Sequence, residues 1–217
     1  MPTRVLLVRH GQSEWNAVGR WQGQADPPLS DVGRQQARSA AKALGAVDAV
    51  FASDLQRAAE TAVIIAHELG IGPVVLDPDL RERDAGEWSG LTRAEIERDW
   101  SGYLEPPPAD KHMSFGATPA AGGGGKRPPG WEPDESVLRR ALRALRRIDS
   151  SVGGGDVLAV AHGGLVYVIE GHLGAGFARM ANGAGRWVEV DGDELRLGDR
   201  ILLVADDGTP VTVPGQI

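Results

Sequence analysis

The sequence predicts an α/β fold, a three-layer sandwich in which helices cover both faces of a mostly parallel central sheet. Short, mostly apolar runs alternate with longer segments whose apolar residues recur every three and four positions; the short runs are 5–8, 48–52, 74–76 and 156–161. Strands of this kind are buried on both faces, and their alternation with helices is typical of parallel sheets. The segments 186–190 and 195–204 flank a turn-like Asp-Gly-Asp and predict antiparallel strands at or near a sheet edge.

Each helix is predicted from its apolar spacing and from the residues at its ends. Ser30 and Asp31 are N-cap candidates for the first long helix, and Ser53 or Asp54 can cap the second, which Gly70 ends. A short helix with a capping box is expected over 92–100, a long one after residue 134 and another over 165–173. The arginines that flank the apolar stripe of the long helix are expected on a solvated face; they are Arg139, Arg140, Arg143, Arg146 and Arg147.

Composition excludes several classes of function. The 217 residues include no Cys, which removes disulfide frameworks, Cys-based zinc sites and thiol catalysis. A formal charge of −7 argues against a general nucleic-acid or membrane binder, because such proteins need a basic surface. No leader-like segment opens the sequence, and no run approaches the ~18 apolar residues of a membrane span, so a soluble, cytoplasmic protein is expected.

The length predicts one domain over 1–217, since domains average roughly 150 residues. A segment at about 105–133 is rich in Pro and Gly and has almost no apolar periodicity. It lies between two predicted helices, so we interpret it as an insertion within the domain. Residues 106–130 are expected to form a flexible flap or to be disordered.

Polar side chains follow the predicted strands at the points where these strands end. Arg9 and His10 follow the first strand, His162 follows the strand that ends at 161, and Arg57 and Glu82 follow the two others. Ligands of open α/β sheets bind at the carboxyl ends of the strands. A single His at the end of a strand is as often a structural residue as a functional one, and a single Arg is more often part of a surface ion pair than of a binding site. Together they favour phosphoryl chemistry, because a guanidinium stays charged and donates two parallel hydrogen bonds to phosphate.

The segment RHGQSEWN at 9–16 resembles the signature of the histidine phosphatase superfamily, also called the phosphoglycerate mutase-like family. Four further blocks, in the same order, are similar to motifs of that family; they are 22–33, 53–62, 80–90 and 162–164. Five ordered motifs are very hard to obtain by chance. They cover most of the chain from 5 to 164, whereas the insertion and the C-terminal tail lie outside them.

The resemblance implies a role for each matched catalytic residue. His10 would be the nucleophile that takes the phosphoryl group, and Arg9, Arg57 and His162 would hold its oxygens and the charge that spreads over them. Glu82 would protonate the leaving alkoxide and later activate water. Positioning and electrostatic stabilisation carry most phosphoryl-transfer catalysis, which agrees with this set.

The same resemblance implies a phosphate-binding set that consists of Arg9, Asn16, Gln22, Arg57, His162 and Gly163. No metal and no other cofactor is expected, because the arginines and a histidine supply the positive charge. His10 must present a neutral nitrogen, so a backbone carbonyl on its other nitrogen is a candidate to fix the tautomer. Glu82 must begin protonated, so activity on the acidic side of neutral is expected.

The function predicted from these residues is hydrolysis of a phosphomonoester through a phosphohistidine, with a small phosphorylated metabolite as the substrate. The residues of block 80–90 resemble those of the phosphatase branch of the family. Two alternatives stay open: a phosphoglycerate-mutase-type phosphoryl transfer, and a catalytically silent phospholigand-binding module. The antiparallel tail can pair with a second copy, which makes a homodimer one expected assembly. Three tryptophans near the motifs fit either a pocket wall or packing; they are Trp15, Trp21 and Trp88.

Overall fold

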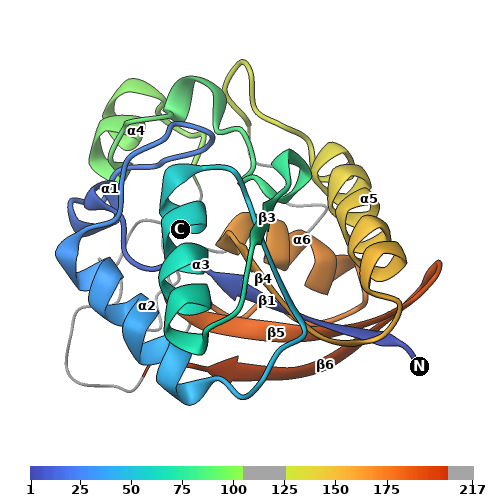
Figure 1. Ribbon diagram of the computed structural model, residues 1–217. Coiled ribbons are helices and arrows are strands. Elements are labelled where there is room, and N and C mark those ends of the chain that lie inside the picture. Colours follow the sequence, from blue (N-terminus) through green and yellow to red (C-terminus); the bar gives the residue numbers. More distant parts are fainter. Residues whose placement is uncertain (105–125, 205–217) are drawn as a thin grey trace.

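The computed structural model describes residues 1–104 and 126–204. Within these residues, six strands form one sheet with the order β3-β2-β4-β1-β5-β6 (Figure 1). The strands are β1 (Thr3–Arg9), β2 (Ala49–Ala52), β3 (Val74–Leu76), β4 (Gly155–Ala161), β5 (Ala184–Asp191) and β6 (Glu194–Leu202). The first four pair in parallel, and β5 and β6 form an antiparallel hairpin at one edge. The predicted α/β fold is therefore confirmed, including its antiparallel edge.

Helices cover both faces of the sheet, as predicted. They are α1 (Glu14–Ala17), α2 (Asp31–Ala43), α3 (Gln56–Leu69), α4 (Arg93–Asp99), α5 (Asp134–Val152) and α6 (Gly163–His172), with 3-10 turns at Pro78–Leu80 and Gly86–Trp88. Figure 1 shows α2 and α3 on one side of the sheet and α5 and α6 on the other. Successive strand residues point to opposite faces, so Val5 and Leu7 pack with α5 and α6, whereas Leu6 and Val8 pack with α2 and α3.

Several helix ends lie where the sequence predicts them. The Ser30 side chain accepts a hydrogen bond from the Gly33 N–H and caps α2. Thr92 and Glu95 form the expected capping box of α4. Gly70 ends α3 with a φ of 67°, a left-handed conformation that side chains disfavour. Helix α6 begins at Gly163, two residues before the predicted start.

The N-terminal cap predicted for α3 is wrong. Leu55 occupies the N-cap position and makes no side-chain cap bond. The Ser53 hydroxyl instead accepts the Leu55 N–H, and Asp54 forms an ion pair with Arg81. The cap comes from a distant loop, because Asp26 Oδ1 accepts the Gln56 N–H at 2.6 Å. This bond ties the 22–33 segment to the helix turn that carries Arg57.

Strand β3 departs from the prediction that each short apolar run is buried. It forms the edge of the sheet opposite β6, and Val75 and Leu76 are 46% and 51% exposed. Residues 105–125 of the predicted insertion lie outside the described residues, so the expectation of a flap or disorder stays a prediction for 106–125. Residues 126–130 are described, and the Pro129 carbonyl accepts the Glu87 N–H at 3.1 Å. The assignment of 1–217 to one domain likewise stays a prediction.

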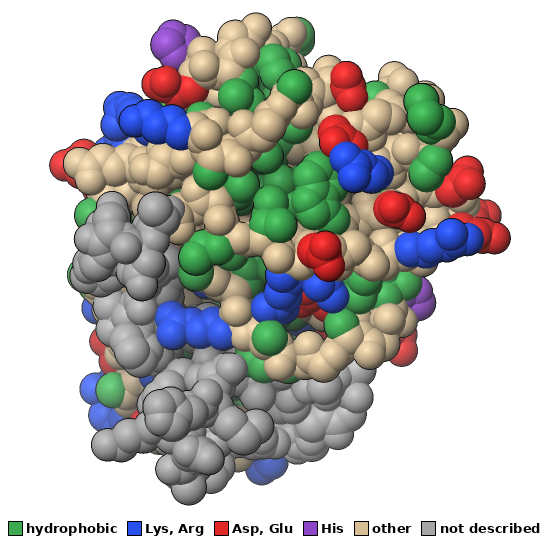
Figure 2. Space-filling view, turned by 90° about the horizontal axis from the view of Figure 1, so that it is seen from below, with side chains coloured by type: hydrophobic (Ala, Val, Ile, Leu, Met, Phe, Trp, Pro, Cys, Tyr) green, Lys and Arg blue, Asp and Glu red, His purple; other side chains and the backbone are tan. Residues whose placement is uncertain are grey.

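Charges of both signs are interspersed over the face that Figure 2 shows, with apolar side chains gathered between them. Among the residues that the structure describes, no helix is long and apolar enough to cross a bilayer. The cytoplasmic location stays a prediction.

Candidate active site

The two strand-terminal histidines lie together at the carboxyl ends of β1 and β4. These strands are parallel neighbours in which Arg9 is aligned with Ala161, so the residues that follow leave the sheet side by side. The His10 N–H donates to the Ala161 carbonyl at 3.1 Å. The ring centroids of His10 and His162 are 5.0 Å apart in an edge-on arrangement, and both side chains are buried.

The hydrogen bonds of His10 define its tautomer. Nδ1 lies 2.6 Å from the Gly11 carbonyl oxygen, and since a carbonyl can only accept, Nδ1 carries the proton. Nε2 keeps its lone pair and accepts from Arg57 Nε at 3.3 Å. Burial, followed by the charges of Arg57 and Arg9, lowers the pKa of His10 well below 6.5. His10 is therefore a neutral imidazole whose Nε2 faces a cation, and the expected backbone carbonyl sits on its other nitrogen.

His162 is fully buried directly before helix α6, and its two ring nitrogens have no hydrogen-bond partner among the described residues. Burial is the main cause that lowers its pKa well below 6.5, and the positive charge of Arg57 adds to the effect. A buried ring with unpaired nitrogens has lost its hydration without replacement, which is costly. An oxygen-rich ligand beside it would remove that cost.

Two buried guanidinium groups flank the imidazoles. Arg57 donates to the carbonyls of Gly23 at 2.9 Å and Ala25 at 2.7 Å, which anchors it to the loop after α1. Arg9 donates to the Met180 carbonyl at 2.7 Å. Burial lowers the pKa of Arg57 to about 10 and also lowers that of Arg9. Both groups stay cationic at neutral pH, and neither forms an ion pair with a carboxylate within the described part of the chain.

Glu82 approaches the same point from the loop after the Pro78–Leu80 turn. Its carboxylate accepts the Gly164 N–H at 3.1 Å and the Arg83 N–H at 2.7 Å. A Cβ at position 164 would lie 2.3 Å from Oε1 of Glu82, so this close approach requires glycine. The side chain of Arg81 pairs with Asp54, whereas Arg83 lines the cavity and pairs with Asp134.

A single cavity collects most of the residues predicted from the sequence. Seven of them line it: Arg9, His10, Asn16, Gln22, Arg57, Glu82 and Gly163. The eighth, His162, is fully buried and is absent from the cavity wall. Gln22 Oε1 accepts a hydrogen bond from the Ser13 hydroxyl at 2.7 Å, and Asn16 Oδ1 accepts the Ser13 N–H at 3.2 Å. The predicted residues thus bring a neutral imidazole, two cations and one carboxylate to this cavity.

The sequence matches the histidine phosphatase superfamily (branch 1) over residues 5–197. The chain belongs to this superfamily. A mycobacterial glucosyl-3-phosphoglycerate phosphatase, solved in complex with VO3, is 31% identical with a TM-score of 0.72; the match covers 90% of this chain and 97% of that one. A metal-independent phosphoserine phosphatase of Arabidopsis thaliana is 32% identical over 205 residues, which are 93% of this chain and 79% of that protein.

A bifunctional protein of Mycobacterium tuberculosis is 41% identical over 165 residues, which are 74% of this chain but only 41% of that protein. The chain therefore spans less than half the length of this relative. The family assignment does not depend on it, because the superfamily match covers most of the sheet, its flanking helices and all five predicted motifs.

Further residues on the wall of this histidine phosphatase cavity were not predicted; they include Arg20, Arg83, Trp131, Gly164 and Tyr167. Tyr167 lies four residues after Gly163 in α6, so helical spacing from the last motif is a signal that points to it. Trp131 lies in the Pro-rich stretch that we interpret as an insertion. Its contact with the site depends on an isolated bridge between Ala85 and Trp131, which no local pattern indicates.

Of the three tryptophans near the motifs, one forms part of the pocket wall and two serve in packing. Trp21 lines the cavity. Trp88 is fully buried beneath it, in edge-on contact with Trp21 and Trp131 at centroid distances of 5.5 and 5.6 Å. Trp15 is not on the cavity wall and lies against Gly90, where an added Cβ would be 3.4 Å from its ring.

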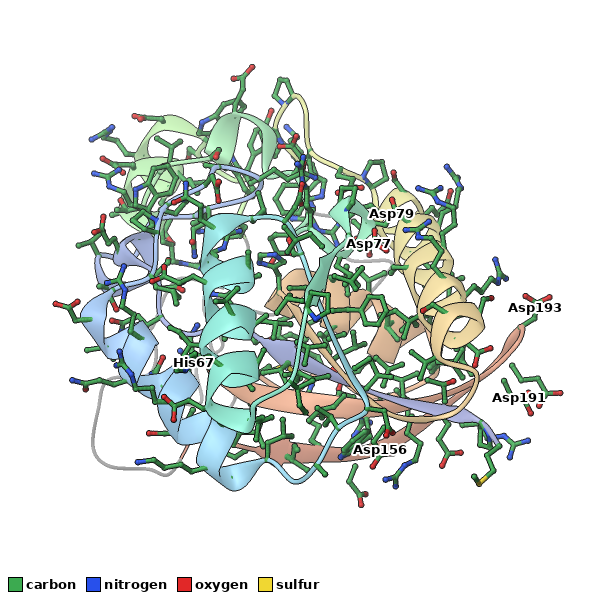
Figure 3. All side chains as sticks on the ribbon, viewed as in Figure 1. His67, Asp77, Asp79, Asp156, Asp191 and Asp193 are labelled. Carbon is green, nitrogen blue, oxygen red and sulfur yellow. The ribbon has the colours of Figure 1, made fainter. Side chains whose placement is uncertain are left out.

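The prediction of a solvated face on α5 is wrong for Arg140, which is buried. Arg143 and Arg147 are exposed but form ion pairs with Asp79, and Arg147 also pairs with Asp77. Figure 3 shows both aspartates beside α5, at the start of the loop that leads to Glu82. Arginine side chains on one face of α5 therefore bind this loop.

Proposed function

We propose that this protein hydrolyses phosphomonoesters of small metabolites through a phosphohistidine intermediate on His10. The observation that carries the proposal is the state of His10, a neutral imidazole with its Nε2 lone pair beside Arg57 and its ring 5.0 Å from His162. A nucleophile for phosphorus needs an unprotonated lone pair inside a positive environment that attracts the phosphate.

In the first step, Nε2 of His10 attacks phosphorus and the bond from phosphorus to the ester oxygen breaks. Protonated Glu82 gives its proton to the leaving oxygen, which departs as an alcohol. Arg9 and Arg57 stabilise the charge on the phosphoryl oxygens, and they are already buried and oriented before the substrate arrives. We assign His162 to the same oxygens because its ring lies 5.0 Å from that of His10; as a neutral imidazole it donates through one ring N–H, and this contact requires the buried ring to become accessible from the cavity when substrate binds.

In the second step, the Glu82 carboxylate takes a proton from water as the water oxygen attacks phosphorus. The bond from phosphorus to nitrogen breaks, which restores neutral His10 and releases inorganic phosphate. Asn16 and Gln22 are assigned to neutral hydrogen bonds with the phosphate, because both line the cavity. No step requires a metal ion.

The names of the relatives support a hydrolase that acts on a small phosphorylated substrate, since one is a phosphoserine phosphatase and another a glucosyl-3-phosphoglycerate phosphatase. A mutase would use the same residues and return the phosphoryl group to a second hydroxyl. Homodimer formation stays a prediction, as does a cytoplasmic location.

The test is phosphate release from a panel that contains p-nitrophenyl phosphate, phosphoserine, 3-phosphoglycerate and nucleotides, measured with EDTA present. Wild type should release phosphate and form an acid-labile phosphoenzyme, whereas His10→Ala should do neither. Isomerisation of 3-phosphoglycerate faster than its hydrolysis would favour the mutase. Binding of vanadate without any phosphate release would favour a silent phospholigand-binding module.

A further inference from the structure

Arg140 of α5 makes an unusual set of hydrogen bonds for a residue on the outer layer of a sandwich. Its buried guanidinium donates to the backbone carbonyls of Asp79 at 3.0 Å, Arg81, and Glu82 at 3.0 Å. The same group donates to both carboxylate oxygens of Glu132, at 2.8 and 2.9 Å. One side chain therefore holds three carbonyls of the loop that carries Glu82.

Glu132 holds the same loop through separate hydrogen bonds. Its backbone N–H donates to the Asp84 carbonyl at 3.0 Å, and its Oε2 accepts the Asp84 N–H at 3.2 Å. Its own carbonyl accepts from Arg83 Nη1 at 2.6 Å. Burial acts to raise the pKa of Glu132, but the hydrogen bonds and charge of Arg140, together with hydrogen bonds from Asp84 and Ser136, hold that pKa below its ordinary value. The carboxylate therefore stays charged at neutral pH and keeps its partner.

The loop depends on this pair for a physical reason. Residues 81–84 lie outside helices and strands, so their carbonyls lack the partners that regular structure supplies. A planar guanidinium with five donors can serve several converging acceptors at once, whereas an ammonium group cannot reproduce that geometry. The Glu82 carboxylate accepts hydrogen bonds from the Gly164 and Arg83 N–H groups, and its backbone carbonyl accepts from the side chains of Arg140 and Gln24.

We propose that Arg140 and Glu132 are positioning residues that orient Glu82 for proton transfer to the leaving group. Neither touches the reacting atoms, since neither lines the cavity. The inference rests on the proposed function, in which Glu82 is the general acid. It also means that the segment 126–133, outside the family motifs, contributes to catalysis in this chain.

The leaving group provides a readout that a purely structural role would not change. An alkyl phosphate expels a strongly basic oxygen and needs the proton from Glu82, whereas nitrophenolate leaves without one. We therefore compare kcat/KM for an alkyl phosphate with kcat/KM for p-nitrophenyl phosphate. The ratio of these two values does not depend on the fraction of folded enzyme, because misfolding lowers both equally.

In Arg140→Met we expect kcat/KM for the alkyl phosphate to fall about 10- to 100-fold, part of the ~10²–10⁴-fold that general acid catalysis supplies. The value for p-nitrophenyl phosphate should fall less than about fivefold, as only the orientation of the acid is disturbed. Arg140→Lys and Glu132→Gln should show the same selective loss to a smaller degree. The matched control is Arg146→Met on the same helix, which pairs with the exposed Asp193 and should leave both values unchanged.

Glu82→Gln separates this inference from the proposed function. If Glu82→Gln is selective for the leaving group but Arg140→Met lowers both values equally, the positioning role is overturned and the acid role of Glu82 stands. If Glu82→Gln itself shows no selectivity, the acid role fails as well. Should Arg140→Met not fold, Arg140→Lys and Glu132→Gln carry the same comparison, and an unchanged ratio in both overturns the proposal.

Discussion

The phosphate end of the cavity and the loop that carries the acid are built in different ways. At the phosphate end, His10 and His162 directly follow neighbouring parallel strands, and the backbone beside His10 sets its tautomer. Glu82 instead lies on a loop held by α5 and by segment 126–133. The comparison teaches that strand ends position chemical groups almost automatically, whereas a loop residue needs a frame from distant parts of the chain.

Substitutions in the two regions should also affect the reaction differently. In the proposed mechanism, groups at the phosphate end stabilise charge on the phosphoryl oxygens, so their loss should slow all substrates alike. The groups proposed to orient Glu82 would act on the leaving oxygen, so their loss should slow alkyl phosphates selectively. Four changes test or sharpen this contrast.

The largest effect is expected from Arg57→Met at the phosphate end. Loss of a buried cation beside His10 should lower kcat/KM about 10³-fold, within the range for removal of a charge-stabilising donor. The fall should be the same for alkyl and p-nitrophenyl phosphates. A loss confined to the alkyl substrate would contradict the division between the two regions, and circular dichroism controls for the fold.

The second-largest effect is expected from acidification, which should lower the free energy of unfolding through the two histidines of the phosphate end. His10 and His162 are neutral in the folded protein, with pKa values well below 6.5, whereas the unfolded chain binds protons near pH 6.5. The unfolded state therefore holds more protons below that pH, and the free energy of unfolding should fall by about 1.4 kcal/mol per pH unit for each histidine. This stability is present above pH 6.5 and is lost as the pH falls toward the folded pKa values.

Urea denaturation between pH 8 and pH 5 measures this loss. The double variant His10→Asn with His162→Asn should flatten the profile in this window. An equally steep profile in the double variant would mean that other groups cause the loss.

Gly164→Ala should disturb the acid while leaving the phosphate end in place. The added Cβ would lie 2.3 Å from Oε1 of Glu82, so the carboxylate must move. We expect kcat/KM for an alkyl phosphate to fall about tenfold or more with little change for p-nitrophenyl phosphate. The matched control is Gly171→Ala in the same helix, where a Cβ has open space. It should keep full activity and raise the free energy of unfolding by about 0.5–1 kcal/mol.

The smallest effect is expected from Arg143→Ala, one helical turn from Arg140. Its side chain is 51% exposed, and its pair with Asp79 is screened by water. The free energy of unfolding should change by less than about 1 kcal/mol, and the leaving-group ratio should not change. A shift of that ratio as large as that of Arg140→Met would show that the whole face of α5 acts together.

Part of the fold and site could be predicted because it depends on local pattern. Apolar runs followed by polar residues place Arg9, His10 and His162 at strand ends, and a capping residue places the start of α2. The chain's own motif order then indicates the family. These features follow from hydrophobic periodicity and from the geometry of parallel strands, which short stretches of sequence carry.

Other features could not be predicted because they join segments that are distant in sequence. The cap of α3 comes from Asp26, thirty residues from the Gln56 N–H that donates to it, and so the local pattern indicated Ser53 or Asp54 instead. Arg140 follows the same spacing as its solvated neighbours on α5. Only the packing of α5 against the 79–84 loop distinguishes it from them.

By itself, the amino-acid sequence determined which strands form the sheet, which residues follow them and which family the motifs resemble, since each of these rests on short-range periodicity and residue type. The tertiary structure alone decided which charged side chain is buried, which backbone carbonyls it serves and which tryptophan faces the cavity. The physical reason is that desolvation and hydrogen-bond satisfaction depend on what surrounds a group in space, and that is settled only when distant segments pack together.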